Sequence, residues 1–350
     1  MTDHPGFDAS APADRIETPE TAGSGARGPL ASVIVVTYHS AATIRACLEP
    51  LAGDDRLELI VVDNASRDDT AALVESVAPR ARLIVSGANL GFAAGVNTGA
   101  RAATADALVL LNPDTRTTAD DLLALVARLA EPGVGIAAPR ILDAAGRRVR
   151  STRRSPRLRD QVVAASGLHR LVPRLDPDRE PPEAARATRP VEVEVVSGAC
   201  FATPRGLFEL LGGLDTRFFL YAEEVDYCVR VRRRGLRVEL VPTSAVTHLG
   251  GVSASHAPFS ASALLRISRV RYFAKHRGRR AAAVTRRAWQ LGALARAPLA
   301  ALTAGRGRRL RAARAHWDVV RSLSGPLDDL VEGRPGDPGP GVSATDSSGP

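Results

Sequence analysis

A short apolar run that ends in an acidic residue constrains this chain most. Ala107–Leu111 is continuously apolar, which predicts a strand buried on both faces of a parallel sheet. Asn112, Pro113 and Asp114 end the run, because proline cannot donate to a strand ladder and Asn and Asp favour turns. Asp114 is therefore expected at the C-terminal edge of the sheet, where open α/β sheets bind ligands. Two roles remain open for Asp114 here: a ligand of a divalent cation, or a cap of the helix that starts near Thr118.

Three further strand-and-helix units precede this run. Their buried strands are predicted at residues 31–37, 57–62 and 82–86. Each strand leads toward a helical segment, and this alternation predicts parallel strands joined by right-handed crossovers. The expected fold class is therefore α/β, with a mostly parallel, Rossmann-like central sheet and helices on both faces. Thr37 and Asp63, at the ends of their strands, should then share the ligand-binding edge with Asp114.

Glycine spacing after the third strand narrows the class of ligand. Gly91, Gly95 and Gly99 recur every four residues, whereas the dinucleotide fingerprint needs two glycines separated by one residue. A nicotinamide-binding fold is therefore disfavoured, while a single mononucleotide on the sheet edge remains compatible with the sequence.

An acidic helix start follows an aromatic run. Residues 218–221 are mostly aromatic and lead into a helix predicted at 222–234. The first turn of this helix carries three acids, Glu223, Glu224 and Asp226. Three neighbouring carboxylates repel one another unless a cation, a helix N-terminus or a proton compensates. One interpretation is a solvated first turn; the aromatic run favours a second, in which the acids face a cleft.

The positive charge of the chain is concentrated near its C-terminus. Between Leu240 and Trp317 there are 15 Lys and Arg and no Asp or Glu; subtracting these 15 from the net charge of +9 leaves −6 for the rest of the chain. A basic stretch interleaved with apolar residues is typical of a helix at an anionic membrane surface, and a solvated helical face is the alternative. Aromatic residues that could stack on bases are sparse and no nucleic-acid motif occurs, so nucleic-acid binding is disfavoured.

Cysteine usage and hydropathy indicate the compartment. The three cysteines, Cys47, Cys200 and Cys228, show no spacing typical of disulfides or zinc sites, so buried reduced thiols are expected. No leader with a basic and an apolar region occurs, and no unbroken apolar run reaches about 20 residues. We therefore expect a cytoplasmic protein, with peripheral association at the inner face of the cell membrane through the basic C-terminus.

Composition sets the expected domain boundaries. Pro-, Gly- and Ser-rich ends predict disordered tails, and the Arg- and Pro-rich residues 151–189 are expected to form a mobile loop with one short helix. The expected organisation is a disordered tail at 1–29, an α/β domain at 30–258, a basic helical region at 259–323 and a disordered tail at 324–350.

Seven motifs resemble those of the inverting family-2 glycosyltransferases with the GT-A fold, and in particular their bacterial rhamnosyltransferase-like branch. The resemblance covers about residues 31–276. Each motif alone is weak, but all seven occur in order at suitable spacing. The motifs are VVTYHS at 35, VVDNASRDDT at 61, NLGFAAGVNTG at 89, LLNPDT at 110, VSGACFATPR at 196, GGLDTRFFLYAEEVDYCVR at 212 and HLGGVS at 248.

On the substrate side, the resemblance implies a donor pocket at the sheet edge. The substrate-binding residues are then Thr37, Tyr38, Asp63, Asn64, Asn89, Gly91, Asn97, Asn112, Ser197 and Gly198. The first three match the pocket for the pyrimidine base and ribose, and the last two match the floor under the donor sugar and the acceptor. Physically, a carboxylate such as that of Asp63 suits the imide N–H of uracil or thymine.

On the metal side, Asp114 matches the last acid of the family's DxD motif, while Asn112 stands in place of the first acid. His248, at a predicted strand end beside glycines, resembles a second metal ligand. The resemblance thus implies Mg²⁺ or Mn²⁺ as a cofactor that neutralises the diphosphate leaving group.

The acidic helix start resembles the family's Glu-Asp motif, which supplies the catalytic base. Glu224 stands at the Asp position and is expected to deprotonate the acceptor hydroxyl, with Glu223 as the alternative base. Asp226 is expected to support the catalytic acids, held by Arg230 at i,i+4.

The resemblance implies an inverting hexosyltransferase. It would move a sugar, with rhamnose as a candidate, from a dTDP- or UDP-linked donor to a polyprenyl-diphosphate-linked or polysaccharide acceptor in cell-envelope glycan synthesis. Two alternatives remain open. A nucleotidyltransferase would need a Gly-rich, Lys-containing loop after the first strand, which is absent. A non-catalytic nucleotide-sugar-binding subunit is disfavoured by the acids Asp63, Asp114, Glu224 and Asp226.

Overall fold

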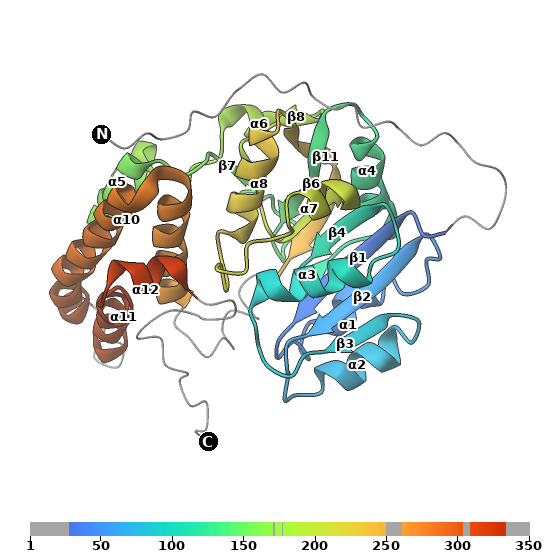
Figure 1. Ribbon diagram of the computed structural model, residues 1–350, viewed down its shortest axis with the longest axis horizontal. Helices are drawn as coiled ribbons and strands as arrows, with labels where there is room; N and C mark the ends of the chain where they lie inside the picture. Colours follow the sequence, from blue (N-terminus) through green and yellow to red (C-terminus); the bar gives the residue numbers. More distant parts are fainter. Residues whose placement is uncertain (1–27, 171, 177, 250–260, 304–308, 334–350) are drawn as a thin grey trace, which may run out of the picture.

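The computed structural model describes residues 28–170, 172–176, 178–249, 261–303 and 309–333 (Figure 1). The expected N-terminal tail lies almost wholly outside these residues. The strands are β1 (Ala31–Thr37), β2 (Leu57–Asp63), β3 (Arg82–Val85), β4 (Ala107–Leu111), β5 (Thr115–Arg116), β6 (Val134–Leu142), β7 (Thr152–Arg153), β8 (Val191–Glu192), β9 (Val195–Val196), β10 (Cys200–Pro204) and β11 (Arg237–His248).

The helices alternate with the strands in the first half of the chain and dominate its end (Figure 1). The α-helices are α1 (Ile44–Leu48), α2 (Thr70–Val77), α3 (Phe92–Ala102), α4 (Ala119–Leu129), α5 (Leu158–Ser166), α6 (Pro182–Arg186), α7 (Arg205–Leu210), α8 (Glu223–Arg233), α10 (Ala261–Thr303), α11 (Arg309–Ser322) and α12 (Leu327–Glu332). Two short 3-10 helices, η1 (Leu168–Arg170) and η2 (Pro173–Leu175), follow α5.

The main sheet confirms the predicted fold class. Its strand order is β3-β2-β1-β4-β10-β6-β11-β5, with β8 paired to β11. Strands β1, β2, β3, β4, β6 and β11 run in one direction, and β5, β8 and β10 run against them. The central sheet is therefore mostly parallel. Strand β10 was not predicted, because its position between β4 and β6 comes from pairing with distant segments.

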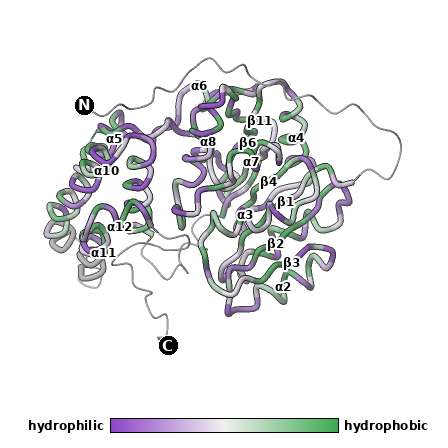
Figure 2. The backbone as a smooth tube through the Cα atoms, in the orientation of Figure 1, coloured by the Kyte–Doolittle hydropathy of each residue, from purple (hydrophilic) through white to green (hydrophobic). Residues whose placement is uncertain are grey.

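Alternating side chains of the central strands build a core on each face of the sheet. On β1, Ile34 and Val36 pack on the side of α3, α7 and α8, while Val33 and Val35 pack on the side of α1, α2 and α4. Figure 2 shows the central strands as predominantly hydrophobic. Helices thus cover both faces, as the predicted doubly covered strands require.

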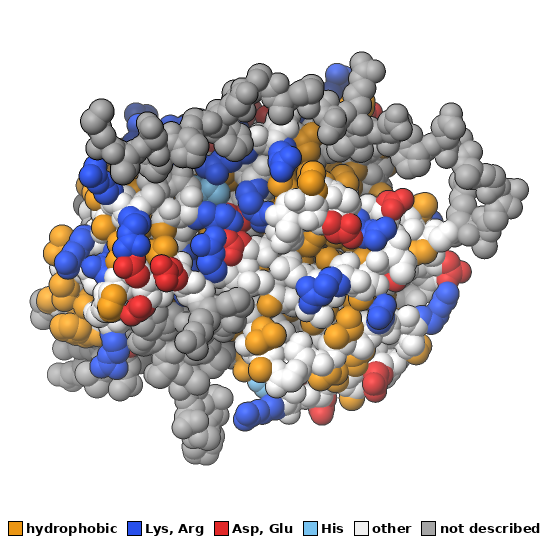
Figure 3. Space-filling view, viewed as in Figure 1, with side chains coloured by type: hydrophobic (Ala, Val, Ile, Leu, Met, Phe, Trp, Pro, Cys, Tyr) orange, Lys and Arg blue, Asp and Glu red, His pale blue; other side chains and the backbone are white. Residues whose placement is uncertain are grey.

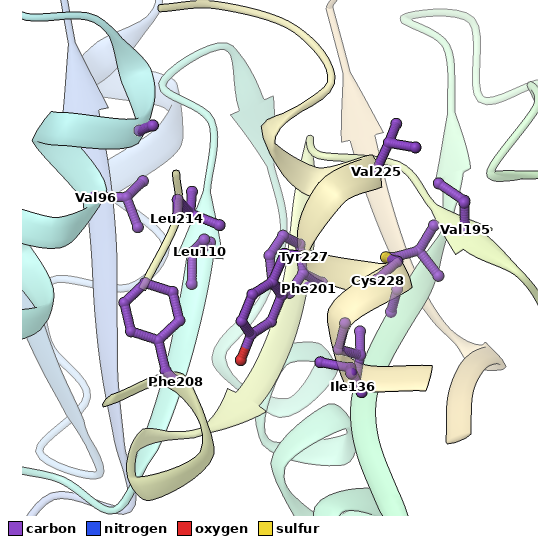
Figure 4. Packing of buried hydrophobic residues seen from close by; sticks show 14 of the residues in the cluster. Val96, Leu110, Ile136, Val195, Phe201, Phe208, Leu214, Val225, Tyr227 and Cys228 are labelled. Carbon is purple, nitrogen blue, oxygen red and sulfur yellow. The ribbon is translucent and has the colours of Figure 1, made fainter. Parts of the chain in front are cut away.

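An aromatic cluster anchors α8 to the sheet. Tyr227 is fully buried, and its ring centroid lies 6.0 Å from that of Phe201 on β10 and 5.4 Å from that of Phe208 on α7 (Figure 4). Its hydroxyl lies 2.9 Å from the hydroxyl of Thr203. Aromatic packing with a satisfied hydroxyl fixes both the position and the rotation of the helix.

The repeated glycines of α3 serve helix–sheet packing. A Cβ on Gly95 would lie 2.6 Å from Cγ1 of Val36, and a Cβ on Gly99 would lie 2.5 Å from Cγ2 of Ile34. These distances are too short for any side chain, so the glycines allow α3 to lie directly on β1.

The C-terminal helices form a separate layer beside the sheet (Figure 1). A small core from α5, α10, α11 and α12 includes Trp289, Val319 and Leu330. Gly278 has φ 82° and ψ 172°, which kinks α10. None of the helices among the described residues is both long and apolar enough to cross a membrane. The expected association with an anionic membrane surface stays a prediction.

Two predicted segments need correction. Residues 151–189 contain a strand, two α-helices and two 3-10 turns rather than a mobile loop with one helix. In the structure α5 packs on α10, β7 pairs with β9 and α6 contacts β8, and the local sequence does not signal these contacts. The predicted tail at 324–350 contains α12, because Leu327, Leu330 and Val331 make a short apolar stripe that packs on α10 and α11; residues 334–350 lie outside the described part.

Residues 191–196 alternate between valine and glutamate up to Val195, which predicts one strand, but the structure divides them between two partners. Val191–Glu192 pairs with β11 in the main sheet, while Val195–Val196 pairs with Thr152–Arg153 in a two-stranded sheet. The alternating pattern indicates extended backbone, but a local pattern does not show with which strand each part pairs.

We predict that Gly99→Ala destabilises the protein, because the new methyl group overlaps Ile34. Overpacking of this kind costs about 1–3 kcal/mol in the free energy of unfolding, measurable by urea denaturation. Gly206→Ala on α7 is the matched control, since no atom lies within 4 Å of the added Cβ. Equal stability of the two variants would contradict the close packing of α3 on β1.

Candidate active site

A cavity of about 320 Å³ lies at the C-terminal edge of the parallel strands. The ends of β1, β2 and β4 meet there with the start of α8 and the end of β11. Twelve of the fifteen predicted site residues line it. They are Thr37, Tyr38, Asn64, Asn89, Gly91, Asn112, Asp114, Ser197, Gly198, Glu223, Glu224 and His248. The structure therefore brings together residues that are up to 211 positions apart in the chain.

Asp114 and His248 face each other at one side of the cavity. Nε2 of His248 lies 3.1 Å from Oδ1 of Asp114, and the carboxylate is 3% exposed. The pairing of β5 with β11 sets His248 opposite Thr115 and so beside Asp114. Thr118, rather than Asp114, caps α4 by accepting a hydrogen bond from the backbone N–H of Asp121. The helix-cap alternative for Asp114 is therefore wrong.

A strained turn places Glu223 and Glu224 at the cavity. Tyr221 and Ala222 have φ of 70° and 69°, the left-handed region that side chains with a Cβ disfavour. Strain of this kind clusters at functional sites, where the surrounding packing enforces it. The turn ends at the first residue of α8, so Glu223 and Glu224 stand at a helix N-terminus, whose dipole favours negative charge.

Glu223 is a buried carboxyl without a hydrogen-bond partner at one oxygen. The residue is 5% exposed, and its Oε2 makes no hydrogen bond within the described residues. Burial, followed by the charge of Glu224, raises the pKa of Glu223 well above its ordinary value. The protonated form of Glu223 is therefore favoured over a range of pH in which an exposed glutamate is ionised.

Glu224 differs from its neighbour because an arginine compensates its charge. Nη2 of Arg153, on β7, forms an ion pair with Oε1 of Glu224. Gly198 makes room for this glutamate, since a Cβ there would lie 3.3 Å from Cγ of Glu224. Arg153 was not predicted as a site residue. The only sequence feature that could have indicated it is the Arg-rich composition of residues 150–154.

Two predicted substrate residues lie outside the cavity lining. Oδ1 of Asp63 accepts a hydrogen bond from the hydroxyl of Thr37 at 2.8 Å, and the residue is only 1% exposed. Asn97 donates to the carbonyl of Leu214 at 2.8 Å and accepts from its N–H at 2.9 Å. Asp63 thus orients Thr37 from outside the cavity lining. Asn97 holds the turn before α8 through its two hydrogen bonds to Leu214, instead of lining the nucleotide pocket.

Asp226 also lies outside the cavity, in a buried cluster of charges. Its carboxylate lies 2.7 Å from Nε of Arg230, 2.7 Å from Nζ of Lys275 and 2.8 Å from Nε2 of His276. Burial opposes the charge, but the hydrogen bond to His276 and the charges of Arg230 and Lys275 lower the pKa of Asp226 below its ordinary value. The expected pairing with Arg230 is present, and the cluster joins α8 to α10.

An α/β fold with an acid-lined cavity at the carboxyl edge of its sheet is typical of enzymes that bind a ligand at that edge. Comparison with known sequences makes this assignment specific. Residues 32–211 match the sequence profile of Glycosyl transferase family 2, and the chain belongs to this family of glycosyltransferases. The predicted resemblance to family-2 glycosyltransferases is confirmed.

Similar proteins include two curated glycosyltransferases. The chain is 30% identical over 246 residues, 65% of this chain and 78% of the relative, to the N-acetylglucosaminyl-diphospho-decaprenol L-rhamnosyltransferase of Mycobacterium tuberculosis. It is 27% identical over 211 residues, 59% of this chain and 63% of the relative, to the low-salt glycan biosynthesis hexosyltransferase Agl10 of Haloferax volcanii. Among solved structures, a mannosyltransferase of Pyrobaculum calidifontis in complex with GDP-Man and Mn²⁺ is 24% identical, with a TM-score of 0.47 and coverage of 85% and 83% of the two chains.

We predict that stability depends on pH through Glu223. Because its folded-state pKa is raised, the free energy of unfolding should fall as pH rises from the unfolded-state pKa of about 4.3 through the folded-state value. Glu223→Gln removes this ionisation and should make the protein more stable than the unmodified chain at pH 8, as measured by urea denaturation. Glu209→Gln, at a side chain that is 59% exposed, is the control and should change nothing. A Glu223→Gln variant that is less stable at pH 8 would contradict the prediction.

Proposed function

We propose that this glycosyltransferase moves a sugar, with L-rhamnose as the first candidate, from a dTDP- or UDP-linked donor to a polyprenyl-diphosphate-linked acceptor in cell-envelope glycan synthesis, with inversion at the anomeric carbon. The observation that carries the proposal is one cavity with Glu224 on one side and the Asp114–His248 pair on another. The name of the mycobacterial relative supports rhamnose and the lipid-linked acceptor. A screen of nucleotide sugars, followed through release of the nucleoside diphosphate, tests the donor.

Glu224 is the proposed base, and its environment supports this choice over Glu223. Glu224 forms an ion pair with Arg153, so a compensating positive charge lies beside it. Burial, followed by the charge of Glu224, raises the pKa of Glu223 and so favours its protonated form, which cannot accept a proton. Two carboxyl groups in different environments thereby take different roles.

The proposed reaction is one displacement. The carboxylate of Glu224 takes the proton of the acceptor hydroxyl, and the acceptor oxygen forms a bond to the anomeric carbon of the donor. The bond between that carbon and the diphosphate oxygen breaks on the opposite side, and the electron pair leaves with the nucleoside diphosphate. One in-line step inverts the configuration.

Asp114 and His248 are the proposed ligands of a divalent cation. A carboxylate and an imidazole suit Mn²⁺ or Mg²⁺, which proteins often hold with few side chains together with substrate phosphates. Among the described residues, no group of three or more His, Cys, Asp or Glu side chains is arranged to hold a metal. This donor set therefore fits a cation that needs phosphate oxygens to complete its coordination. When bound, the cation would neutralise charge on the leaving group.

We predict that Glu224→Gln lowers kcat by about 10²–10⁴-fold, the usual contribution of a general base. Donor affinity should remain within about twofold, since the amide preserves the shape of the side chain. Glu223→Gln is the matched control. It imitates a protonated Glu223, so its kcat should fall by less than about tenfold. Losses of equal size in the two variants would contradict the assignment of the base.

We predict that Asp114→Asn and His248→Ala each weaken binding of a nucleoside diphosphate in the presence of Mn²⁺ by about tenfold or more. Titration calorimetry with UDP, with Mn²⁺ and then with EDTA, measures the cation-dependent part. Asp120→Asn is the control, because its side chain is 83% exposed and lies in a surface ion pair. If Asp114→Asn retained the full response to Mn²⁺, the metal assignment would be wrong.

A further inference from the structure

A second cavity lies in the C-terminal helical part of the molecule. Its volume is about 280 Å³, and it shares no lining residue with the first cavity. Figure 3 shows that Lys and Arg side chains gather over the C-terminal helices and their border with the sheet. The lining residues come from α5, η1, α10, α11 and the segment after η2.

The polar side chains of this cavity suit a phosphate group. Arg266, Arg269 and Arg296 outnumber the two aspartates of the lining, which gives the lining a positive charge. Guanidinium groups bind phosphate oxygens through paired hydrogen bonds. Nδ1 of His169 is buried and makes no hydrogen bond within the described part of the chain. A ligand oxygen at this atom would recover the free energy lost by burying it unpaired.

The two aspartates of the lining do not repel an anion strongly, because an arginine neutralises each of them. Oδ1 of Asp178 lies 3.3 Å from Nη2 of Arg269, and Oδ2 of Asp176 lies 3.1 Å from Nη2 of Arg150. Burial, followed by the charge of Arg153, lowers the pKa of Arg269 below its ordinary value. The charge of Arg269 is thus buried and only partly compensated by Asp178, so a further anion would stabilise it.

Apolar side chains share the lining with these charged groups. They are Leu265, Ala293, Val319 and the indole of Trp289. The guanidinium carbon of Arg266 lies 4.5 Å from the centroid of the Trp289 ring, so cationic and apolar lining side chains are in contact at this pair. A cavity lined in this way fits a molecule that joins a phosphate to a hydrocarbon chain.

A short series of contacts connects this cavity with the proposed base. Oε1 of Glu180 accepts hydrogen bonds from the backbone N–H groups of Ser151 and Thr152, at 3.0 and 3.2 Å. The next residue is Arg153, which forms the ion pair with Glu224. The two aspartates of the second cavity precede Glu180 in the same segment. One loop therefore supports both the second cavity and the arginine that holds the base.

We propose that the second cavity binds the diphosphate of a prenyl-diphosphate-linked acceptor, with its arginines on the phosphate oxygens and its apolar side chains on the first isoprenoid units. This inference rests on the function proposed above and specifies how the acceptor is held. The acceptor is then bound through a group that the reaction leaves unchanged, and its sugar remains available to Glu224 in the first cavity.

Titration calorimetry with geranyl diphosphate tests this proposal. EDTA is present throughout, so that diphosphate binding through a cation in the first cavity is suppressed. The full-length chain should bind geranyl diphosphate, and Arg266→Gln and Arg296→Gln should each weaken binding by about tenfold or more. Arg287→Gln is the matched control, since this exposed arginine lies on the same helix outside the cavity and should have no effect. Circular dichroism establishes that each variant is folded.

Inorganic pyrophosphate is the second probe, and it separates a prenyl diphosphate site from a site for free diphosphate. It should bind more weakly than geranyl diphosphate, because it makes no contact with the apolar side chains of the lining. Equal affinity for the two probes, absence of binding, or an equal loss in Arg287→Gln would each overturn the proposal. Binding of UDP with Mn²⁺ is measured in the same variants. If UDP binds normally and geranyl diphosphate does not, this inference fails while the proposed function stands.

Discussion

The position of the cavity glutamates depends on the ion pairs of the buried Asp226 carboxylate. Arg230, Lys275 and His276 surround it, and Arg230 also donates to the carbonyls of Leu211 and Gly213. One carboxylate therefore joins α8, the turn before it and α10. Burying several charges carries a large desolvation cost, and loss of one partner from such a cluster typically costs about 3–5 kcal/mol. The cluster consequently specifies a single placement of α8 and of the glutamates at its start.

The glutamates themselves are held in an unfavourable state. Tyr221 and Ala222 are strained, and Glu223 is buried beside a second carboxyl group. Such costs persist only when the surrounding structure enforces them. Here the cluster at Asp226, in the same turn of the helix, and the packing of Tyr227 against two aromatic rings enforce them. The contacts of Asp226 and Tyr227 thus hold the start of α8, with Glu223 and Glu224, in place.

The parts of the fold that could be predicted from the sequence are those with strong local patterns. Continuous apolar runs gave β1, β2 and β4 nearly to the residue, and the polar residues that end them marked the site edge. Strands β7 and β10 and the ion pair of Arg153 were missed, because each depends on partners more than forty residues away. The prediction of Asn97 as a substrate-binding residue failed for a different reason. A motif does not distinguish a residue that binds a ligand from a residue that holds a turn in place, as Asn97 does through its hydrogen bonds to Leu214.

The active site is assembled from two units of the chain that differ in origin. The Asp114–His248 pair is a product of the sheet, since β5 and β11 bring these residues together. The glutamates belong to α8, which depends on α10 for its placement, and their counter-charge comes from β7. A glycosyltransferase must hold a donor and an acceptor separately and align them for one displacement. The proposed site follows that requirement, because the sheet unit supplies Asp114 and His248, the proposed side chains for the diphosphate, and the helical unit supplies Glu224, the proposed base. In this proposal the C-terminal helices support the catalytic residues, although they lie outside the sheet.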